Sequence, residues 1–123
     1  MNILILDDDQ SVGQSLSALL TLDGHAVVYI EDPRDVDDFE TRQIDLLICD
    51  FQFGEVTAAY VLRLPGFEQI SQRILISGHD RSEIPHMVLT QFSDFIHKLD
   101  ATAVSRRIRS VSDAASVRDR NVS

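Results

Sequence analysis

The sequence predicts an α/β fold, a parallel sheet of five strands covered by helices on both faces. Short aliphatic runs of strand length alternate along the chain with segments whose apolar residues recur at helical spacing, and this alternation is typical of such a sheet. The first run is apolar throughout, as in strands buried on both faces. A length of 123 residues, 44% of them hydrophobic, fits one domain with a substantial core.

The first strand is expected over 3–6, where four aliphatic residues stand together. A helix should follow, because apolar residues recur after it at helical spacing. These residues are Val12, Leu16, Leu19 and Leu20. Gly24 is well placed to end this helix in a left-handed cap, since glycine adopts a positive φ without steric cost.

The second strand is expected over 26–30. Asp32 and Pro33 then form an N-cap and first-turn pair, because aspartate accepts a backbone N–H and proline has none to lose. The short helix that they open should present Val36 and Phe39 to the core.

The third strand is expected over 46–49 and ends at Asp50. Thr57 is placed to cap a brief helix, which Pro65 and Gly66 stop. The core-facing residues of that helix are Val61 and Leu62.

The fourth strand is expected over 74–76, a helix over 82–91 with Pro85 near its start, and the fifth strand over 95–96. A final helix should follow, with an apolar stripe of Val104, Ile108, Val111 and Ala115. We expect the folded domain over 1–115 and a polar tail over 116–123.

Charge and composition exclude several functional classes. A net charge of −9 argues against direct nucleic-acid binding, which needs a basic surface. The single cysteine, Cys49, cannot form an internal disulfide and suits a reducing cytoplasm. No signal peptide and no run of about 18 apolar residues is present, so we expect a cytoplasmic protein without a membrane span.

Chemically suggestive side chains stand where the expected strands end. Asp7 and Asp8 follow the first strand, Asp50 the third, Ser77 the fourth and Lys98 the fifth. Parallel sheets bind ligands at this edge, and a few carboxylates are the ligands that Mg²⁺ prefers. With the lysine and the hydroxyl, such a cluster can hold phosphoryl oxygens, and Asp50 is the best candidate to accept a phosphoryl group.

Two further residues near this cluster receive structural interpretations. Asp9 is interpreted as a solvated or helix-capping carboxylate, and Cys49 as buried packing inside its strand. The three adjacent aspartates at 7–9 repel one another, so the first two of them need a positive partner.

Four motifs, "ILILDDD", "DLLICD", "ILISG" and "DFIHK", occur in order and spacing similar to those of the receiver domain of bacterial two-component response regulators. The resemblance spans about residues 1–112. It implies a flavodoxin-like fold with strand order 2-1-3-4-5. It also implies a phosphoprotein of phosphorelay signal transduction, which catalyses its own phosphorylation from phosphohistidine and its autodephosphorylation and is not a conventional enzyme.

The same resemblance implies roles for individual residues. Asp50 is the phosphoacceptor, with Asp7, Asp8 and the main-chain carbonyl of Gln52 as further Mg²⁺ ligands. The other implied site residues are Lys98 as the cation, Ser77 as the switch hydroxyl and Phe95 as the switch aromatic. The implied partners are a histidine kinase or phosphotransfer protein and a downstream target or output domain outside this sequence, and two copies could pair as a homodimer.

The sequence departs from the receiver pattern in three places. Leu99 stands where receivers usually have a proline after the lysine, reached through a cis bond that costs about 2.5–4 kcal/mol for other residues. The segment "FQFGEVTAAY" lacks the usual Met-Pro and later glycine. The stretch 77–98 is compact, so its helix should be short.

Two alternative functions stay open. One is a receiver-like interaction module that signals without phosphorylation, which the altered loops permit. The other is a haloacid-dehalogenase-like phosphatase, which also begins with a strand and Asp-x-Asp, here Asp7 to Asp9. That family needs an acidic pair after its lysine, and only Asp100 is near.

Overall fold

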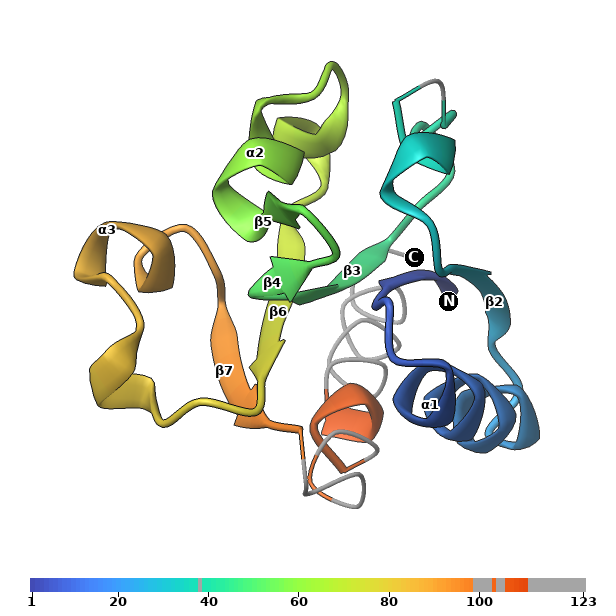
Figure 1. The fold of residues 1–123 in the computed structure, drawn as a ribbon. Coiled ribbons are helices and arrows are strands. Elements are labelled where there is room, and N and C mark those ends of the chain that lie inside the picture. The colour runs from blue at the N-terminus through green and yellow to red at the C-terminus, as the bar shows by residue number, and fades with distance from the viewer. Residues whose placement is uncertain (38, 99–102, 104–105, 111–123) are drawn as a thin grey trace, which may run out of the picture.

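The computed structural model describes residues 1–37, 39–98, 103 and 106–110. Within them, five parallel strands form one sheet in the order β2-β1-β3-β6-β7 (Figure 1). The strands are β1 (Asn2–Leu6), β2 (Ala26–Ile30), β3 (Leu46–Asp50), β6 (Gln72–Ser77) and β7 (Asp94–His97). Numbered within this sheet alone, the order is 2-1-3-4-5, so the predicted flavodoxin-like fold is confirmed. The direction of winding changes between β1 and β3, which is the topological switch point.

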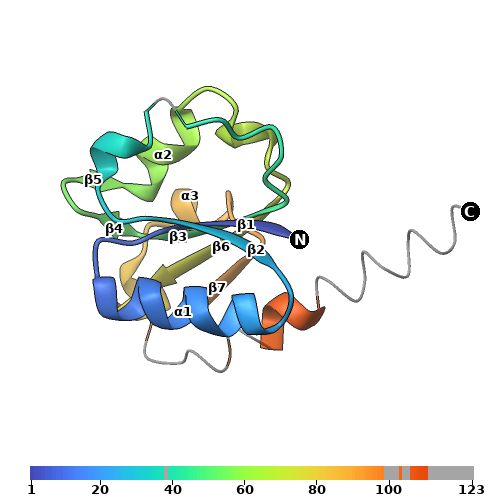
Figure 2. The ribbon, with the colours of Figure 1, turned by 90° about the vertical axis from the view of Figure 1, so that its right-hand side faces the viewer.

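Helices cover both faces of the sheet (Figure 2). Helix α1 (Gln10–Leu22) and the helical residues 106–110 pack on one face, and α2 (Ala58–Arg63) and α3 (His86–Leu89) pack on the other. No helix among the residues described is long and apolar enough to cross a membrane.

The three central strands, β1, β3 and β6, place buried side chains on both faces, because successive side chains point to opposite sides of the sheet. Toward α2 lie Leu4, Leu6, Leu47, Cys49 and Leu75. Toward α1 lie Ile3, Ile5, Leu46, Ile48, Ile74 and Ile76. All of these side chains are essentially inaccessible to solvent, which explains why the runs are apolar without alternation.

Helix α1 begins and ends as its sequence predicts. The Asp9 side chain accepts the Val12 N–H at 3.3 Å as an N-cap, which confirms the capping interpretation. Gly24 has φ +93°, and two reverse bonds close the end of the helix: His25 N–H to the carbonyl of Leu20 at 3.1 Å and Gly24 N–H to Thr21 at 3.0 Å. Leu16 and Leu20 are buried, whereas Leu19 lies at the rim with 38% of its surface exposed.

Two predicted helical segments differ from their expected form, although the compact stretch 77–98 correctly predicted that its helix is short. The segment after β2 makes only a 3₁₀ turn over Pro33–Asp35, capped by Asp32, although Val36 is buried as predicted. The helix expected over 82–91 is wrong as a single element: a 3₁₀ turn over Arg81–Glu83 precedes the four-residue α3. Pro85 separates them because it restricts Ile84, whose φ of −91° and ψ of 129° are extended.

The segment between β3 and α2 contains an element that the sequence did not predict. Strands β4 (Gln52–Phe53) and β5 (Val56–Thr57) form a two-stranded antiparallel hairpin. Gly54, with φ +60°, lies in its turn. The hairpin leads directly into α2, where Thr57 is the N-cap residue but its side chain makes no capping hydrogen bond. A 3₁₀ turn over Phe67–Gln69 connects α2 to β6.

The structure leaves part of the C-terminal prediction untested. Near the C-terminus, Ile108 is fully buried against the α1 face of the sheet, as its helical stripe predicts. Leu99, the rest of the stripe (Val104, Val111 and Ala115) and the boundary at 115 with the tail over 116–123 lie outside the described residues.

Candidate functional site

Three carboxylates meet at the C-terminal edge of the sheet. Asp50 is the last residue of β3, and Asp7 and Asp8 follow the adjacent β1. One carboxylate oxygen from each lies within 4.8 Å of the other two. Adjacent parallel strands end at the same edge, so residues more than 40 positions apart converge as the sequence predicts.

Lys98 bridges two of these carboxylates. Its Nζ lies 2.9 Å from Asp7 Oδ1 and 2.9 Å from Asp50 Oδ2, and its side chain is 15% exposed. Burial lowers the pKa of Lys98, but the hydrogen bonds to Asp50 and Asp7 outweigh burial and raise it above its ordinary value. The ammonium therefore stays charged at neutral pH. Lys98 is also the only lysine in the chain.

Asp50 is held in an environment that disfavours its charge. The residue is 5% exposed, and burial, with the nearby charge of Asp7, raises the pKa of its carboxyl from 3.8 to about 6. The bonds from Lys98 and from the Gln52 N–H, at 3.4 Å, act in the opposite direction. Additional positive charge at this site would favour the ionised form of Asp50, and only the ionised carboxylate can act as a nucleophile.

The donor set fits a hard divalent cation. Asp7 is fully buried, and its Oδ1 accepts the Asp9 N–H at 2.9 Å as well as the Lys98 ammonium. Among the described residues its Oδ2 is buried without a hydrogen-bond partner. A buried carboxylate oxygen of this kind needs a partner, and Asp8, which is exposed, leaves the solvent side open for the waters that Mg²⁺ keeps.

Ser77 ends β6, the strand next to β3, and Phe95 lies in β7; their environments differ. Ser77 is 1% exposed, and its Oγ accepts the His79 N–H at 2.9 Å. Its carbonyl accepts the Lys98 N–H at 2.8 Å, so the two residues are linked through the backbone. Phe95 is half-buried and packs against the core cluster on the α2 side.

The structure tests the role expected of Cys49 but not the one expected of Gln52. Cys49 is fully buried beside Asp50, and burial raises the pKa of its thiol, which confirms the packing interpretation. Gln52 lies two residues after Asp50, in β4. A metal-ligand role for its main-chain carbonyl stays a prediction.

Tyr29 is a residue of this site that the sequence pattern did not predict. Its hydroxyl donates to the main-chain carbonyl of Asp7 at 2.8 Å, although the two residues are 22 positions apart. Tyr29 lies in β2, where its residue type signals only a strand. Gly13, inside α1, was the one feature of the sequence that could have pointed to Tyr29. Glycine weakens a helix interior, so its presence there indicates that a neighbouring group needs the space.

The pKa of Asp50 predicts how the metal-free protein responds to pH. Because the folded pKa, about 6, exceeds the unfolded value of 3.8, the neutral carboxyl stabilises the fold. This contribution is fully present below about pH 3.8 and is lost as the pH rises through about 6. The free energy of unfolding in EDTA, relative to Asp50→Asn, should therefore fall between these pH values.

Urea unfolding at several pH values measures this difference, and the Asp50→Asn reference cancels the titration of the carboxylates outside this cluster. A difference that stays flat between pH 4 and pH 7 would contradict the prediction.

Comparisons with known proteins support the receiver interpretation in sequence and in fold. No family model matches the chain. A curated relative, response regulator RR06 of Streptococcus pneumoniae serotype 2, is 28% identical over 95 residues. The match covers 76% of this chain and 38% of that protein, so the chain spans well under half of the relative's length.

Solved structures share the fold over nearly the whole chain. A response regulator receiver domain protein from Clostridium thermocellum has a TM-score of 0.74 at 19% identity, covering 94% of this chain and 97% of that one. The signal receiver domain of a putative Luxo repressor protein from Vibrio parahaemolyticus has a TM-score of 0.77 at 17% identity, covering 96% and 94%. A CheY-like receiver domain from Methylobacillus flagellatus has a TM-score of 0.74 at 20% identity, covering 90% and 98%. The resemblance carried by the four motifs is thereby confirmed.

Proposed function

We propose that this chain, which has the fold of response regulator receiver domains, accepts a phosphoryl group on Asp50 in a Mg²⁺-dependent reaction and so switches a surface that another protein binds. The observation that carries the proposal is the position of the Asp50 carboxylate, which is bonded to Lys98 and lies within 4.8 Å of oxygens of Asp7 and Asp8. The donor is a phosphohistidine on a histidine kinase or phosphotransfer protein.

In the transfer step, a carboxylate oxygen of Asp50 attacks the phosphorus while the bond from phosphorus to the histidine nitrogen breaks, and the imidazole leaves with that electron pair. The product is an acyl phosphate on Asp50. Lys98 contacts the reacting carboxylate at 2.9 Å and offsets the negative charge of the phosphoryl oxygens. When bound by Asp7, Asp8 and Asp50, Mg²⁺ supplies the remaining charge neutralisation.

Removal of the phosphoryl group is a separate reaction, in which water is the nucleophile. Water attacks the phosphorus while the bond from phosphorus to the Asp50 oxygen breaks, and the carboxylate leaves with that electron pair, so the products are inorganic phosphate and free Asp50. Both phosphorylation and this autodephosphorylation use the same charged groups, which is why one compact site serves for both. The reducing cytoplasm is the compartment that we propose, because the single cysteine, Cys49, is buried and free.

The switch that follows rests on Ser77 and Phe95. The Ser77 oxygen accepts an N–H from His79, which leaves its hydroxyl hydrogen available for a phosphoryl oxygen. We expect Ser77 to turn toward that group and Phe95 to fill the space vacated, a two-state equilibrium biased by the phosphate. Serine lacks the second Cβ substituent of threonine, so its rotamer is less restricted and the coupling is looser.

The binding surface that changes is expected around Phe95 and the final helix. Its partner is a separate target protein, an output domain outside this sequence or a second copy of the chain. The alternative, an interaction module independent of phosphorylation, keeps the same fold but does not require Asp50 to react. The haloacid-dehalogenase alternative needs Asp9 in the reaction, whereas here the Asp9 side chain caps α1.

Beryllofluoride, which mimics a phosphoryl group on aspartate, tests the proposal. Because Lys98 is the only lysine, protein labelled with ¹⁵N-lysine has one backbone amide signal, and that amide donates to Ser77. We expect the signal to shift on adding beryllofluoride with Mg²⁺ and to stay unchanged with beryllofluoride alone or with Mg²⁺ and fluoride.

Each alternative function has its own outcome in this experiment. No shift under any condition favours the phosphorylation-independent module. A shift that persists in Asp50→Asn but is lost in Asp7→Asn favours the dehalogenase-like phosphatase.

A further inference from the structure

Two hydrogen bonds join the loop that carries Asp7 and Asp8 to the end of β2, and a third contact lies just beyond the loop. The Asp7 N–H donates to the Ile30 carbonyl at 3.3 Å, and the Tyr29 hydroxyl donates to the Asp7 carbonyl at 2.8 Å. Outside the loop, the Gln10 side-chain amide donates to both Glu31 carboxylate oxygens at 2.9 and 2.8 Å. Figure 2 shows β1 and β2 side by side above α1, the arrangement that brings these segments together.

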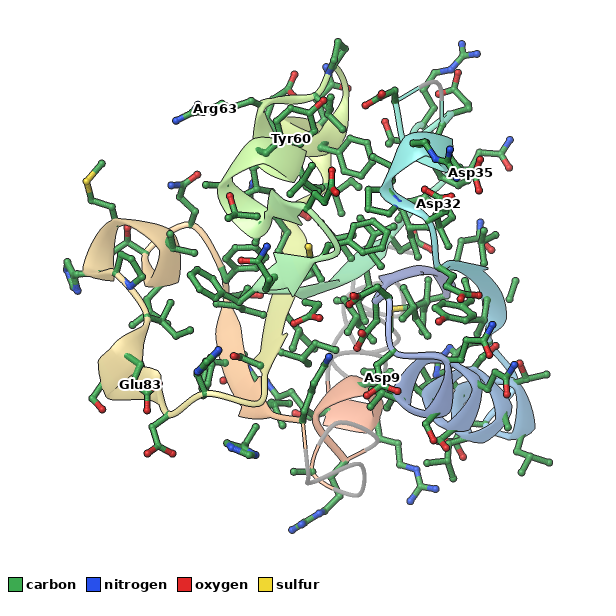
Figure 3. All side chains as sticks on the ribbon, in the orientation of Figure 1. Asp9, Asp32, Asp35, Tyr60, Arg63 and Glu83 are labelled. Atoms are coloured by element: carbon green, nitrogen blue, oxygen red, sulfur yellow. The ribbon has the colours of Figure 1, made fainter. Side chains whose placement is uncertain are left out.

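Of these three contacts, only the Tyr29 hydrogen bond joins a side chain to the loop itself. Its hydroxyl also lies 3.5 Å from the Asp9 carbonyl, at the residue labelled beside the start of α1 in Figure 3. The ring packs on the α1 side of the core. Burial and then the charge of Glu31 raise the pKa of Tyr29 to about 12, so the hydroxyl remains a donor throughout the neutral range.

A glycine in α1 makes room for this tyrosine. Gly13 lies in the first part of the helix and is buried. A Cβ built there would overlap the Tyr29 ring and lie 2.6 Å from its hydroxyl oxygen. Glycine costs a helix interior about 1 kcal/mol relative to alanine, and the position of Tyr29 explains why alanine does not fit.

The hydrogen bond from Tyr29 matters because the loop carries carboxylates that repel one another and the carboxylate of Asp50. Without a bound metal ion, the single charge of Lys98 offsets only part of the negative charge of the three carboxylates. The remaining repulsion favours separation of the loop from β3. A backbone held in place before the cation binds lowers the cost of ordering it on binding.

We propose that Tyr29, seated on Gly13, is a positioning residue for the cation site: its hydroxyl fixes the backbone of Asp7 so that the Asp7 and Asp8 carboxylates face Asp50. The inference rests on the proposed function, since it assumes that the three carboxylates bind Mg²⁺. By this inference, β2 contributes to metal binding by holding the backbone that carries two of the ligands, which neither the carboxylates themselves nor Lys98 does.

The test compares Mg²⁺ binding by wild type, Tyr29→Phe and Gly13→Ala, using titration calorimetry and the Mg²⁺-dependent rise in Tm. Tyr29→Phe removes only the hydroxyl, and Gly13→Ala keeps the hydroxyl but displaces it. Each should weaken Mg²⁺ binding about three- to tenfold, the usual net effect of one lost hydrogen bond. In a Tyr29→Ala background, Gly13→Ala should cause no further loss, because no ring remains to be displaced.

Two other variants frame the result. Tyr60→Phe removes the hydroxyl of the chain's second tyrosine, which bonds Asp37 at 3.3 Å on the surface, and should bind Mg²⁺ like wild type. Asp8→Ala should remove most of the Mg²⁺-dependent rise in Tm.

Two failures can be told apart. If Tyr29→Phe and Gly13→Ala lose the same Tm with and without Mg²⁺ and bind it as wild type does, Tyr29 only supports the fold and the inference is overturned. If wild type itself binds no Mg²⁺, the proposed function fails and the inference fails with it.

Discussion

Replacing Asp50 with asparagine should abolish phosphorylation of this chain by a phosphohistidine donor. The amide is close in shape to the carboxylate, but its neutral oxygen is a poor nucleophile and cannot form a stable acyl phosphate. The substitution also leaves Lys98 one bond to a carboxylate, at Asp7, in place of two. The measurement is Mg²⁺-dependent incorporation of labelled phosphate that is sensitive to hydroxylamine, a property of acyl phosphates.

The matched control is Asp37→Asn, which makes the same chemical change at an exposed aspartate. This variant should incorporate label as wild type does, and EDTA should prevent labelling of both proteins. Undiminished, hydroxylamine-sensitive labelling of Asp50→Asn would assign the reaction to another carboxylate, and the proposed roles of the site residues would have to be revised.

Replacing Lys98 with alanine should lower the free energy of unfolding by about 3–5 kcal/mol at neutral pH without Mg²⁺, the usual cost of removing one partner from a buried ion pair. The ammonium contacts Asp7 and Asp50 at 2.9 Å each, and both carboxylates are buried. Without it, two like charges would face each other with no cation. Urea unfolding in EDTA measures the loss.

The origin of this loss can be checked on the same variant. Mg²⁺ should restore much of the stability, because it supplies positive charge to the same carboxylates. Lowering the pH should restore part of it by protonating Asp50, whose pKa rises further once Lys98 no longer lowers it. Arg34→Ala, which breaks an exposed ion pair with Asp32, should change the free energy of unfolding little. A Lys98→Ala protein as stable as wild type, with no response to Mg²⁺, would show that the carboxylates are satisfied in another way.

Local features of the sequence were sufficient to predict the strands of the sheet, whereas their order was implied only by the resemblance to receivers. An aliphatic run such as 3–6 or 46–49 is buried on both faces wherever it pairs, so its composition alone indicates a central strand. Asp9 and Gly24 at the ends of α1 were predictable for the same reason, because caps act within a few residues of themselves. The convergence of Asp7, Asp8, Asp50 and Lys98 followed from strand ends meeting at one edge.

Helix lengths were less predictable, because short helices depend on packing more than on their own residues. The periodic residues over 82–91 indicate a helix, yet the chain forms a 3₁₀ turn and a four-residue helix on either side of Pro85. Each strand of the β4–β5 hairpin is two residues long, which is too short to show an alternation of apolar and polar residues in the sequence.

The acidic, lysine and hydroxyl groups of the candidate site were thus determined by the sequence alone, because each stands beside an apolar run that specifies a strand. Only the tertiary structure decided how they are held. The bridge from one Lys98 ammonium to both Asp7 and Asp50, and the reach of Tyr29 over Gly13 to the Asp7 carbonyl, join residues from different strands and a helix. Such contacts depend on the distance between packed elements, and no local pattern of residues specifies that distance.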